Sequence, residues 1–432
     1  MTSKAEHFMS KDDVPSGACE SSAVREGEWS ATERWLCQPG QCTGCLACLD
    51  ACPVHAIETR EREGFFFPWI DGSKCVQCGC CRQACPVLQP DPAATAGFAG
   101  SDCYLGWAHD DAIRMASSSG GIFGLLARKQ LEQGGAVCGA AFDAGMCLRH
   151  TLVDDLAGLP PLLRSKYVQS DMAGIHRRIR GRLEQGQSVF FCGTPCQTAA
   201  LRHELGTEAD GRLVLANFAC HGVPSPVIFA HYLQWLEKRV GDQITDFVFR
   251  DKRYGWTAGL FAVIRFKRKG ERIVSFGANF YYRCFIEYHL LRECCAACPF
   301  RKCPAGADIT LADFWGIHRL FALNNQRDRF KGYSGILAHT DAGRRLLSSL
   351  EGSVHLVPMR REALIENNSF RDHTVGMRAA EFLERERADP TYSYFMKWPQ
   401  IGWRQRAELI GRMLLRSWFY PLARLVGRAV TL

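Results

Sequence analysis

Two closely spaced runs of cysteine constrain this 432-residue chain more than any other feature. The first run is Cys42, Cys45, Cys48 and Cys52, and the second is Cys75, Cys78, Cys81 and Cys85. Each run has the spacing C-x2-C-x2-C-x3-C and is followed directly by a proline. Bacterial-type ferredoxins use this spacing to hold two [4Fe-4S] clusters through thiolates. The sequence therefore predicts a module that moves single electrons.

The two runs are expected to share their ligands. In two-cluster ferredoxins the fourth cysteine of each run binds the other cluster. We therefore assign one cluster to Cys42, Cys45, Cys48 and Cys85, and the other to Cys75, Cys78, Cys81 and Cys52. Cys80 precedes Cys81, and the spacing favours Cys81 as the ligand. Zinc sites also use C-x2-C pairs, but usually with a long gap between them, which these tandem runs lack.

Composition agrees with a metal-binding, cytoplasmic chain. The sequence holds 22 cysteines, and no leader peptide is expected, which favours metal sites over disulfides. A hydrophobic content of 47% is ordinary for a globular protein. The net charge of +8 favours acidic partners or a membrane surface, and does not indicate nucleic-acid binding. No segment approaches the roughly 20 apolar residues of a spanning helix.

The order of segments predicts a small ferredoxin domain followed by a larger body. We expect a flexible tail over 1–34, the ferredoxin domain over 35–90 and a linker over 91–100. The body is divided into a first part over 101–185, a second part over 186–345 and a C-terminal α/β extension over 346–403. A basic amphipathic helix is expected over 404–432.

Within the body, apolar runs alternate with helical patterns, which predicts a mixed α/β fold. Helices are expected over 122–133 and 225–240. Strands are expected over 136–142, 188–192, 212–220, 244–249, 260–266, 272–276, 309–311 and 334–338. The apolar piece 63–68 between the two cysteine runs resembles a further strand.

The segment 404–432 has two open interpretations. Its arginines alternate with leucine, isoleucine and aromatic residues, as in helices that lie on an anionic membrane. The alternative is a helix that packs on this protein or on a partner.

A second group of cysteines lies farther along the chain. Cys196 follows a predicted strand, Cys220 is expected to end another, and Cys295 and Cys298 form a C-x2-C pair. The ends of neighbouring strands can converge, so these four could hold a third cluster. Spacing alone equally allows buried cysteines in the core. Cys294 and Cys303 flank the pair and could replace one ligand.

At this point the body resembles a known family. The stretches 118–124, 165–168, 193–199, 220–223, 295–298 and 307–316 resemble the β subunit of coenzyme F420-reducing hydrogenase and its dehydrogenase relatives. The resemblance implies a flavin-binding α/β domain that holds FAD beside a cluster, with Cys196, Cys220, Cys295 and Cys298 as ligands. It also places the flavin at Ser118, Ser119, Gly120, Gly121, Lys166, Gly193 and Thr194.

Two side chains are candidates for catalysis. Lys166 would lie near the flavin, where a cation favours its reduced anionic form. His221 adjoins a predicted ligand and could transfer a proton to the substrate, although a histidine hydrogen-bonded within the core is the more common arrangement. Asp251 and Lys252 could bind a charged substrate or form ion pairs on a loop.

The stretches 249–256 and 313–316 look like a bacterial branch associated with polysaccharide biosynthesis, in which use of coenzyme F420 is not established. The prediction is an iron–sulfur flavoprotein oxidoreductase that acts on a small-molecule or a sugar- or lipid-linked substrate, with ferredoxin or another redox protein as its electron partner. The alternatives are an electron-transfer subunit of a larger hydrogenase or dehydrogenase, and a redox enzyme of surface polysaccharide biosynthesis.

Overall fold

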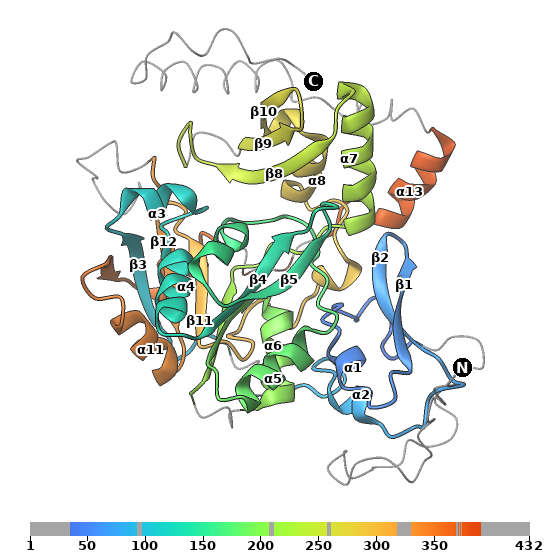
Figure 1. The fold of residues 1–432 in the computed structure, drawn as a ribbon, viewed down its shortest axis with the longest axis horizontal. Helices are drawn as coiled ribbons and strands as arrows, with labels where there is room; N and C mark the ends of the chain where they lie inside the picture. The colour runs from blue at the N-terminus through green and yellow to red at the C-terminus, as the bar shows by residue number, and fades with distance from the viewer. Residues whose placement is uncertain are drawn as a thin grey trace, which may run out of the picture.

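The structure is a computed structural model that describes residues 35–92, 97–206, 211–256, 261–317, 330–368, 370, 372 and 374–389. The predicted tail over 1–34 and the predicted helix over 404–432 lie outside these residues. Three units are visible: a small N-terminal module, a large central sheet with helices, and a small sheet beside the long helix α7 (Pro226–Val240) (Figure 1).

The N-terminal module combines a hairpin with two single-turn helices. Strand β1 (Ile57–Arg62) pairs antiparallel with β2 (Phe65–Ile70), and the turn between them uses left-handed backbone at Glu63 and Gly64. The helices are α1 (Ala47–Asp50) and α2 (Cys80–Gln83), one in each cysteine run. The predicted strand at 63–68 is therefore present as β2. Cys48, Cys52 and Cys85 pack with apolar side chains in the centre of the module.

The central sheet has the strand order β13-β3-β12-β11-β7-β6-β4-β5. Its members are β3 (Asp102–Ala108), β4 (Ala136–Phe142), β5 (Leu148–Val153), β6 (Val189–Gly193), β7 (Leu213–Phe218), β11 (Ile309–Asp313), β12 (Ser334–Ala338) and β13 (Val354–Pro358). Strands β4, β6, β7 and β11 are parallel, and the remaining pairs are antiparallel. The parallel strands are apolar on both faces because helices cover both sides.

Helices α4 (Ile122–Glu132) and α11 (Asp341–Ser348) pack on one face of this sheet, and α5 (Ile175–Glu184) and α6 (Pro195–Leu205) pack on the other. The short helices α3 (Asp111–Ala116) and α12 (Arg361–Ile365) contact β3. Phe190 points to the first face and Phe191 to the second, and both are fully buried. This alternation is what a strand buried on both sides requires.

The small sheet contains β8 (Ile244–Asp251), β9 (Phe261–Phe266) and β10 (Gly270–Ser275), all antiparallel. It packs with α7 and α8 (Phe280–Ile286) around an aromatic core that includes Phe229, Phe247 and Tyr281. The same core takes in Phe65 and Phe67 of the module and Phe382 of α13 (Ala379–Ala388). The module is therefore joined to the body by a continuous apolar core.

Most of the predicted elements are confirmed, with shifted ends. The predicted strand over 212–220 ends at Phe218, so Cys220 lies in the loop that follows rather than at the end of a strand. Strand β13 comes from the predicted extension over 346–403 but is an edge strand of the central sheet, so the described part of that segment belongs to the body. Short 3-10 helices occur at Leu156–Gly158, Pro160–Leu162, Phe276–Ala278 and Glu293–Cys295.

Candidate functional site

The two cysteine runs have the same backbone conformation. Left-handed residues occur at Gly44 and Leu46 in the first run and at Gln77 and Gly79 in the second. In each run these positions are two residues and four residues after the first cysteine. Alternation of right- and left-handed residues turns successive backbone N–H groups toward one point, which forms a concavity for an anion and occurs at many iron–sulfur sites. The loops therefore fit an anionic cluster.

The fold groups the module cysteines as the cross-ligation rule predicts. The inner module set is Cys42, Cys45, Cys48 and Cys85, all of them buried. The outer module set is Cys52, Cys75, Cys78 and Cys81, of which only Cys52 is buried. The pKa of Cys48 is raised mainly by burial and then by the three other thiols of the inner set. The pKa of Cys81 is raised to about 12, mainly by burial and then by the three other thiols of the outer set.

The body set is the four cysteines predicted to hold a third cluster: Cys196, Cys220, Cys295 and Cys298. Cys196 lies in the first turn of α6, Cys220 in the loop after β7, and Cys295 and Cys298 in the segment before β11. The pKa of Cys220 is raised to about 12, mainly by burial and then by the neighbouring thiols of Cys295 and Cys196. The pKa of Cys298 is also raised to about 12, mainly by burial and then by the thiols of Cys295 and Cys220. These four thiols therefore lie near one another, although they are far apart in the sequence.

One backbone N–H already donates to a predicted ligand sulfur. The N–H of Ala56 donates to Sγ of Cys52 at 3.2 Å, and hydrogen bonds to cluster sulfurs help to set reduction potentials. Within the described part of the chain, no three His, Cys, Asp or Glu side chains lie close enough to hold a single metal ion. In a cubane each thiolate binds a different iron, so its ligands stand farther apart than those of a single ion.

Two further thiols lie against these sets. A hydrogen bond from Cys37, which outweighs the opposing effect of burial, lowers the pKa of Cys85 to about 6. A hydrogen bond from Cys294 likewise lowers the pKa of Cys295 to about 7. The position of Cys294 beside the C-x2-C pair marks it in the sequence. No spacing signal marks Cys37, because it precedes the first run by five residues.

The three sets follow one another in space. Cys81 of the outer set contributes to the raised pKa of Cys48 in the inner set. Cys45 of the inner set packs with Ala200 of α6, the helix that contains Cys196. Val87 of the module packs in the same apolar cluster as Cys196 and Cys298. The order is therefore outer module set, inner module set, body set.

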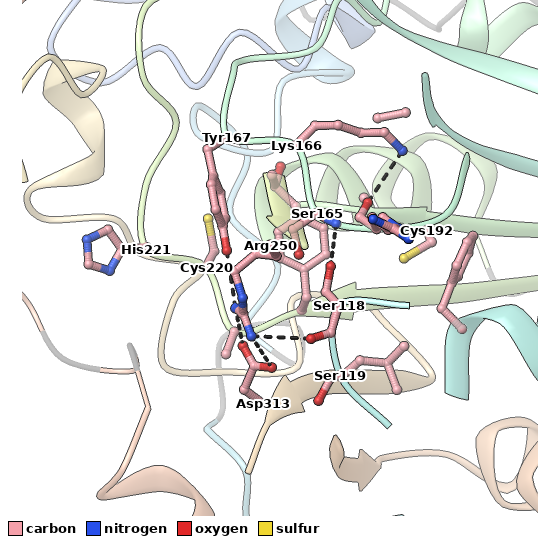
Figure 2. A pocket seen from close by; sticks show the side chains of 18 of the residues that line it. Ser118, Ser119, Ser165, Lys166, Tyr167, Cys192, Cys220, His221, Arg250 and Asp313 are labelled. Atoms are coloured by element: carbon pink, nitrogen blue, oxygen red, sulfur yellow. Dashed lines mark hydrogen bonds and ion pairs between the residues drawn. The ribbon is translucent and has the colours of Figure 1, made fainter. Parts of the chain in front are cut away.

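A cavity of about 330 Å³ lies next to the body set. It opens where the parallel strands β6, β7 and β11 end, and it is lined there by Cys192 and Gly193, by Phe218 and Cys220, and by Asp313 (Figure 2). Crevices outside the carboxyl ends of parallel strands are the usual ligand sites of α/β sheets. Its volume is within the range of small-molecule and cofactor pockets.

One wall of the cavity is polar. It includes Ser118 and Ser119, just before α4, and Ser165 and Lys166 from the loop before α5. The hydroxyl of Ser118 accepts the N–H of Ser165 at 2.7 Å, and Nζ of Lys166 donates to the carbonyl of Leu163 at 2.8 Å. Burial lowers the pKa of Lys166 to about 7. The lysine thus changes charge near neutral pH.

The glycines predicted at the flavin differ in position. Gly121 lines the cavity with left-handed backbone, immediately before α4. Gly120 packs between β3 and β12, and a Cβ atom there would clash with the carbonyl oxygen of Gly106. Gly193 and Thr194 line the cavity, and Thr194 forms a capping box with Gln197 at the start of α6.

An ion pair supports the polar wall. Arg250 donates to both carboxylate oxygens of Asp313, at 2.7 and 3.0 Å, and to the carbonyl of Ser118 at 3.3 Å (Figure 2). Burial opposes the charge of Arg250, but Asp313, Tyr167 and Tyr282 together raise its pKa. The sequence interpretation did not assign a role to Arg250, although it lies in the stretch 249–256.

The neighbours of Arg250 hold loops in place. Nζ of Lys252 is buried and donates to the carbonyls of Ser119 at 2.7 Å and Lys331 at 2.6 Å. Asp251 pairs with Arg164 and Arg253. Neither Asp251 nor Lys252 lines the cavity. Asp251 therefore forms ion pairs, whereas Lys252 binds backbone carbonyls, and neither contact favours substrate binding.

His221 lies beside the body set and lines the cavity. Its ring stacks on Tyr288, with the ring centroids 3.9 Å apart. Burial lowers the pKa of His221 to about 4. The imidazole is therefore neutral at physiological pH, and its predicted role in proton transfer stays a prediction.

A buried polar network in the cavity wall has no counterpart in the sequence interpretation. His150 bonds to Ser170 at 2.9 Å, and the amide of Gln197 donates to the same hydroxyl at 3.0 Å. Gln197 in turn accepts the N–H of Thr194 at 2.8 Å. His150 and Ser170 have no motif around them in the sequence, so only the fold reveals the network.

Comparison with known proteins identifies two segments. Residues 186–361 match the family model that describes the C terminus of the beta subunit of coenzyme F420 hydrogenase/dehydrogenase. Residues 41–88 match a 4Fe-4S dicluster domain. The first match contains all four cysteines of the body set and begins after Ser118 and Lys166.

Among solved structures, a chain of the F420-reducing [NiFe] hydrogenase complex from Methanosarcina barkeri is similar to this chain at 16% identity and a TM-score of 0.40. The similarity covers 60% of this chain and 84% of that chain. No curated protein matches this chain.

These findings confirm the N-terminal ferredoxin-type 4Fe-4S domain and the mixed α/β body, and they support an iron–sulfur oxidoreductase. Flavin binding and a role in polysaccharide synthesis stay predictions. Among the described residues, no helix is both long and apolar enough to cross a membrane.

Proposed function

We propose that this chain is an iron–sulfur flavoprotein oxidoreductase in which the body set holds a third [4Fe-4S] cluster beside a flavin. Cys220 carries this proposal because it belongs to the body set and also lines the cavity. A cluster ligand in a cavity wall brings a one-electron centre next to whatever the cavity binds. In such an enzyme, bound clusters exchange single electrons and a bound flavin can exchange two.

The cavity residues suit a flavin, proposed here as FAD, in two ways. Ser118, Ser119, Gly121 and Lys166 supply hydroxyls, a helix N-terminus and a cation for phosphate groups. Cys220 and His221, with Gly193 and Thr194, form the part of the cavity near the body set. Gly120 contributes indirectly, because its missing side chain lets the Ser118 loop approach β3.

The order of the cysteine sets gives the proposal a direction in space. The outer set is partly exposed, the inner set is buried, and the body set adjoins the cavity. Electrons would enter or leave at the outer set, with ferredoxin or another redox protein as the partner. The substrate would exchange electrons at the cavity.

The first test is the cofactor content of protein purified and reconstituted anaerobically. Three cubanes and one flavin correspond to about 12 iron atoms and one FAD per chain. About 8 iron atoms and no flavin would contradict the proposal.

That second result would favour the alternative of an electron-transfer subunit, which the match to a hydrogenase/dehydrogenase beta subunit model supports. In that case, partners in stoichiometric amounts should co-purify with the chain.

The proposed substrate class is a small molecule or a sugar- or lipid-linked intermediate of surface polysaccharide assembly. The stretch 249–256 and the basic segment 404–432 support this class. Comparison of surface glycans between cells with and without the gene tests it. Sedimentation with anionic vesicles, with and without residues 404–432, tests contact with a membrane.

A further inference from the structure

A fully buried arginine joins the module to the body. Arg292 has 0% of its surface exposed and lies in the loop just before Cys295. Its Nε donates to the carbonyl of Cys42 at 2.7 Å, and its Nη2 lies 3.6 Å from Sγ of the same residue. Its Nη1 donates to Gln169 at 3.0 Å and to the carbonyl of Phe66 at 3.2 Å.

The remaining surroundings of this guanidinium are apolar. It lies 3.9 Å from the ring centroid of Phe67 and 5.4 Å from that of Phe65. Gly44 lies so close that a Cβ atom there would be 3.0 Å from Nη1. Within the described ranges, no carboxylate forms an ion pair with Arg292. Its polar contacts are neutral carbonyls, one amide and the Cys42 sulfur.

A buried cation without a counter-charge is costly, because the protein interior cannot replace the water it has lost. Among the atoms around Arg292, the one that becomes anionic on cluster assembly is Sγ of Cys42, since iron binds the thiolate and not the thiol. A [4Fe-4S] cluster with four thiolates is a net anion, and it gains one further negative charge when it is reduced. The cluster can therefore supply the counter-charge that the protein does not.

We propose that Arg292 is the counter-ion of the cluster held by the inner module set, and that it makes this cluster easier to reduce. The inference rests on the proposed cluster sites, but it requires neither the flavin nor a substrate. Because the positive charge lies near the sulfur, it stabilises the reduced form more than the oxidised form. The inner cluster would then hold the electron at the point next to the body set.

The charge of Arg292 also reaches the body set. Arg292 precedes Cys295 of that set by three residues. The influence on the inner set is more direct, because Arg292 contacts Cys42 itself. We therefore expect the main effect on one cluster.

The test is a redox titration of the full, reconstituted chain with dithionite, followed by electron paramagnetic resonance. R292Q removes the charge, and R292K keeps the charge but not the fork that reaches Cys42. R114Q is the matched control: Arg114 is 2% exposed and donates to the carbonyl of Gly332, away from the cysteine sets.

In R292Q we expect the equilibrium constant for reduction of one cluster to fall by at least a factor of ten. For one electron this lowers the reduction potential of that cluster by about 59 mV. R292K should lower the same step less, and R114Q should move none. Steps that do not move in R292Q, or that all fall equally, would overturn the proposal. If R292Q fails to assemble, a tenfold or larger fall in R292K, which keeps the charge, would overturn it.

The outcomes separate this inference from the proposed function. Wild-type protein that assembles clusters but binds no flavin would contradict the proposed function and leave the role of Arg292 open to the same titration. Wild-type protein that takes up no iron would overturn both. Iron content and flavin content are therefore measured before the titration.

Discussion

The carboxylate of Asp50 accepts the backbone N–H of His176 at 2.9 Å. Its other oxygen accepts the N–H of Gly174 at 2.9 Å. Helix α5 begins at Ile175 after a glycine, so it has no side-chain cap of its own. Asp50 lies in α1 of the ferredoxin module, between two cluster cysteines, and caps a helix of the body instead. The cap and Arg292 are polar contacts that fix the module to the body.

Removal of this cap should destabilise the chain. We expect D50A to lower the free energy of unfolding by about 1–2 kcal/mol, because two N–H groups at a helix end lose their acceptor. Urea denaturation of reconstituted protein measures the change. E58Q is the control and should have little effect, since among the described residues Glu58 pairs with Arg60 alone, on the surface of the same module. Equal stability of D50A and wild type would contradict the capping role.

Substitution in the body set should remove one cluster. We expect C220S to lose about one third of the bound iron, which is about 4 of 12 atoms, while the module keeps its share. Iron and sulfide analysis measures this loss. The control is C103S: Cys103 is buried, whereas Cys220 is half-buried, and it belongs to an apolar cluster without cysteines of the three sets. Full iron content in C220S would show that Cys220 is not a ligand.

Flavin binding should weaken as the pH rises through neutrality. Burial lowers the pKa of Lys166 to about 7, so the side chain is charged below that pH and neutral above it. Phosphate groups bind the charged form more strongly, and we expect about a tenfold loss of FAD affinity between pH 6 and pH 8. Quenching of flavin fluorescence measures the affinity.

K166M should bind FAD weakly and remove this pH dependence, whereas the same slope in K166M would assign the pH dependence to another group.

The effect of Lys166 on folding stability has the opposite sign. Between pH 7 and 10.5 the unfolded chain holds a proton on Lys166 that the folded chain has released, so this residue favours folding more as the pH rises.

The Arg250–Asp313 pair should be among the most sensitive in the body. Both side chains are largely buried, so R250Q leaves a carboxylate without its partner and should cost about 3 kcal/mol. The double variant R250Q/D313N should cost less than the sum of the single variants. The control is R344Q, since Arg344 and Asp102 form an exposed pair worth about 1 kcal/mol or less. Chemical denaturation of R250Q, D313N, the double variant and R344Q measures these costs. If the costs of the two single variants simply add in the double variant, the prediction is contradicted.

The sequence was most informative where one short segment carries a whole pattern. The two cysteine runs predicted their module because each run spans only eleven residues. The parallel strands β4 and β6 and the helices α4 and α7 were predicted because their apolar residues are continuous or periodic. Strand β5 was missed because Arg149 and His150 interrupt its apolar residues, and β3 was missed because Asp102 begins it and Gly106 interrupts it.

Contacts between distant segments could not be predicted in the same way. Arg250 and Asp313 meet across 63 residues, and Asp50 and His176 across 126. Arg292 and Cys42 are separated by 250 residues. Each contact depends on how the module and the two sheets are packed, and none leaves a local pattern. The resemblance pointed to the cysteines of the body set, but the packing of the inner set against α6 required the fold.

The unequal exposure of the three cysteine sets bears on how the protein is handled. Cys75, Cys78 and Cys81 are partly exposed, while the inner set is buried. Dissolved oxygen reaches exposed clusters first, and thiolates with access to solvent are the most easily oxidised. Preparations exposed to air should therefore lose iron from the outer set before the inner set. On the proposed electron path, such material would keep its colour and its inner cluster, yet it could no longer exchange electrons with a partner.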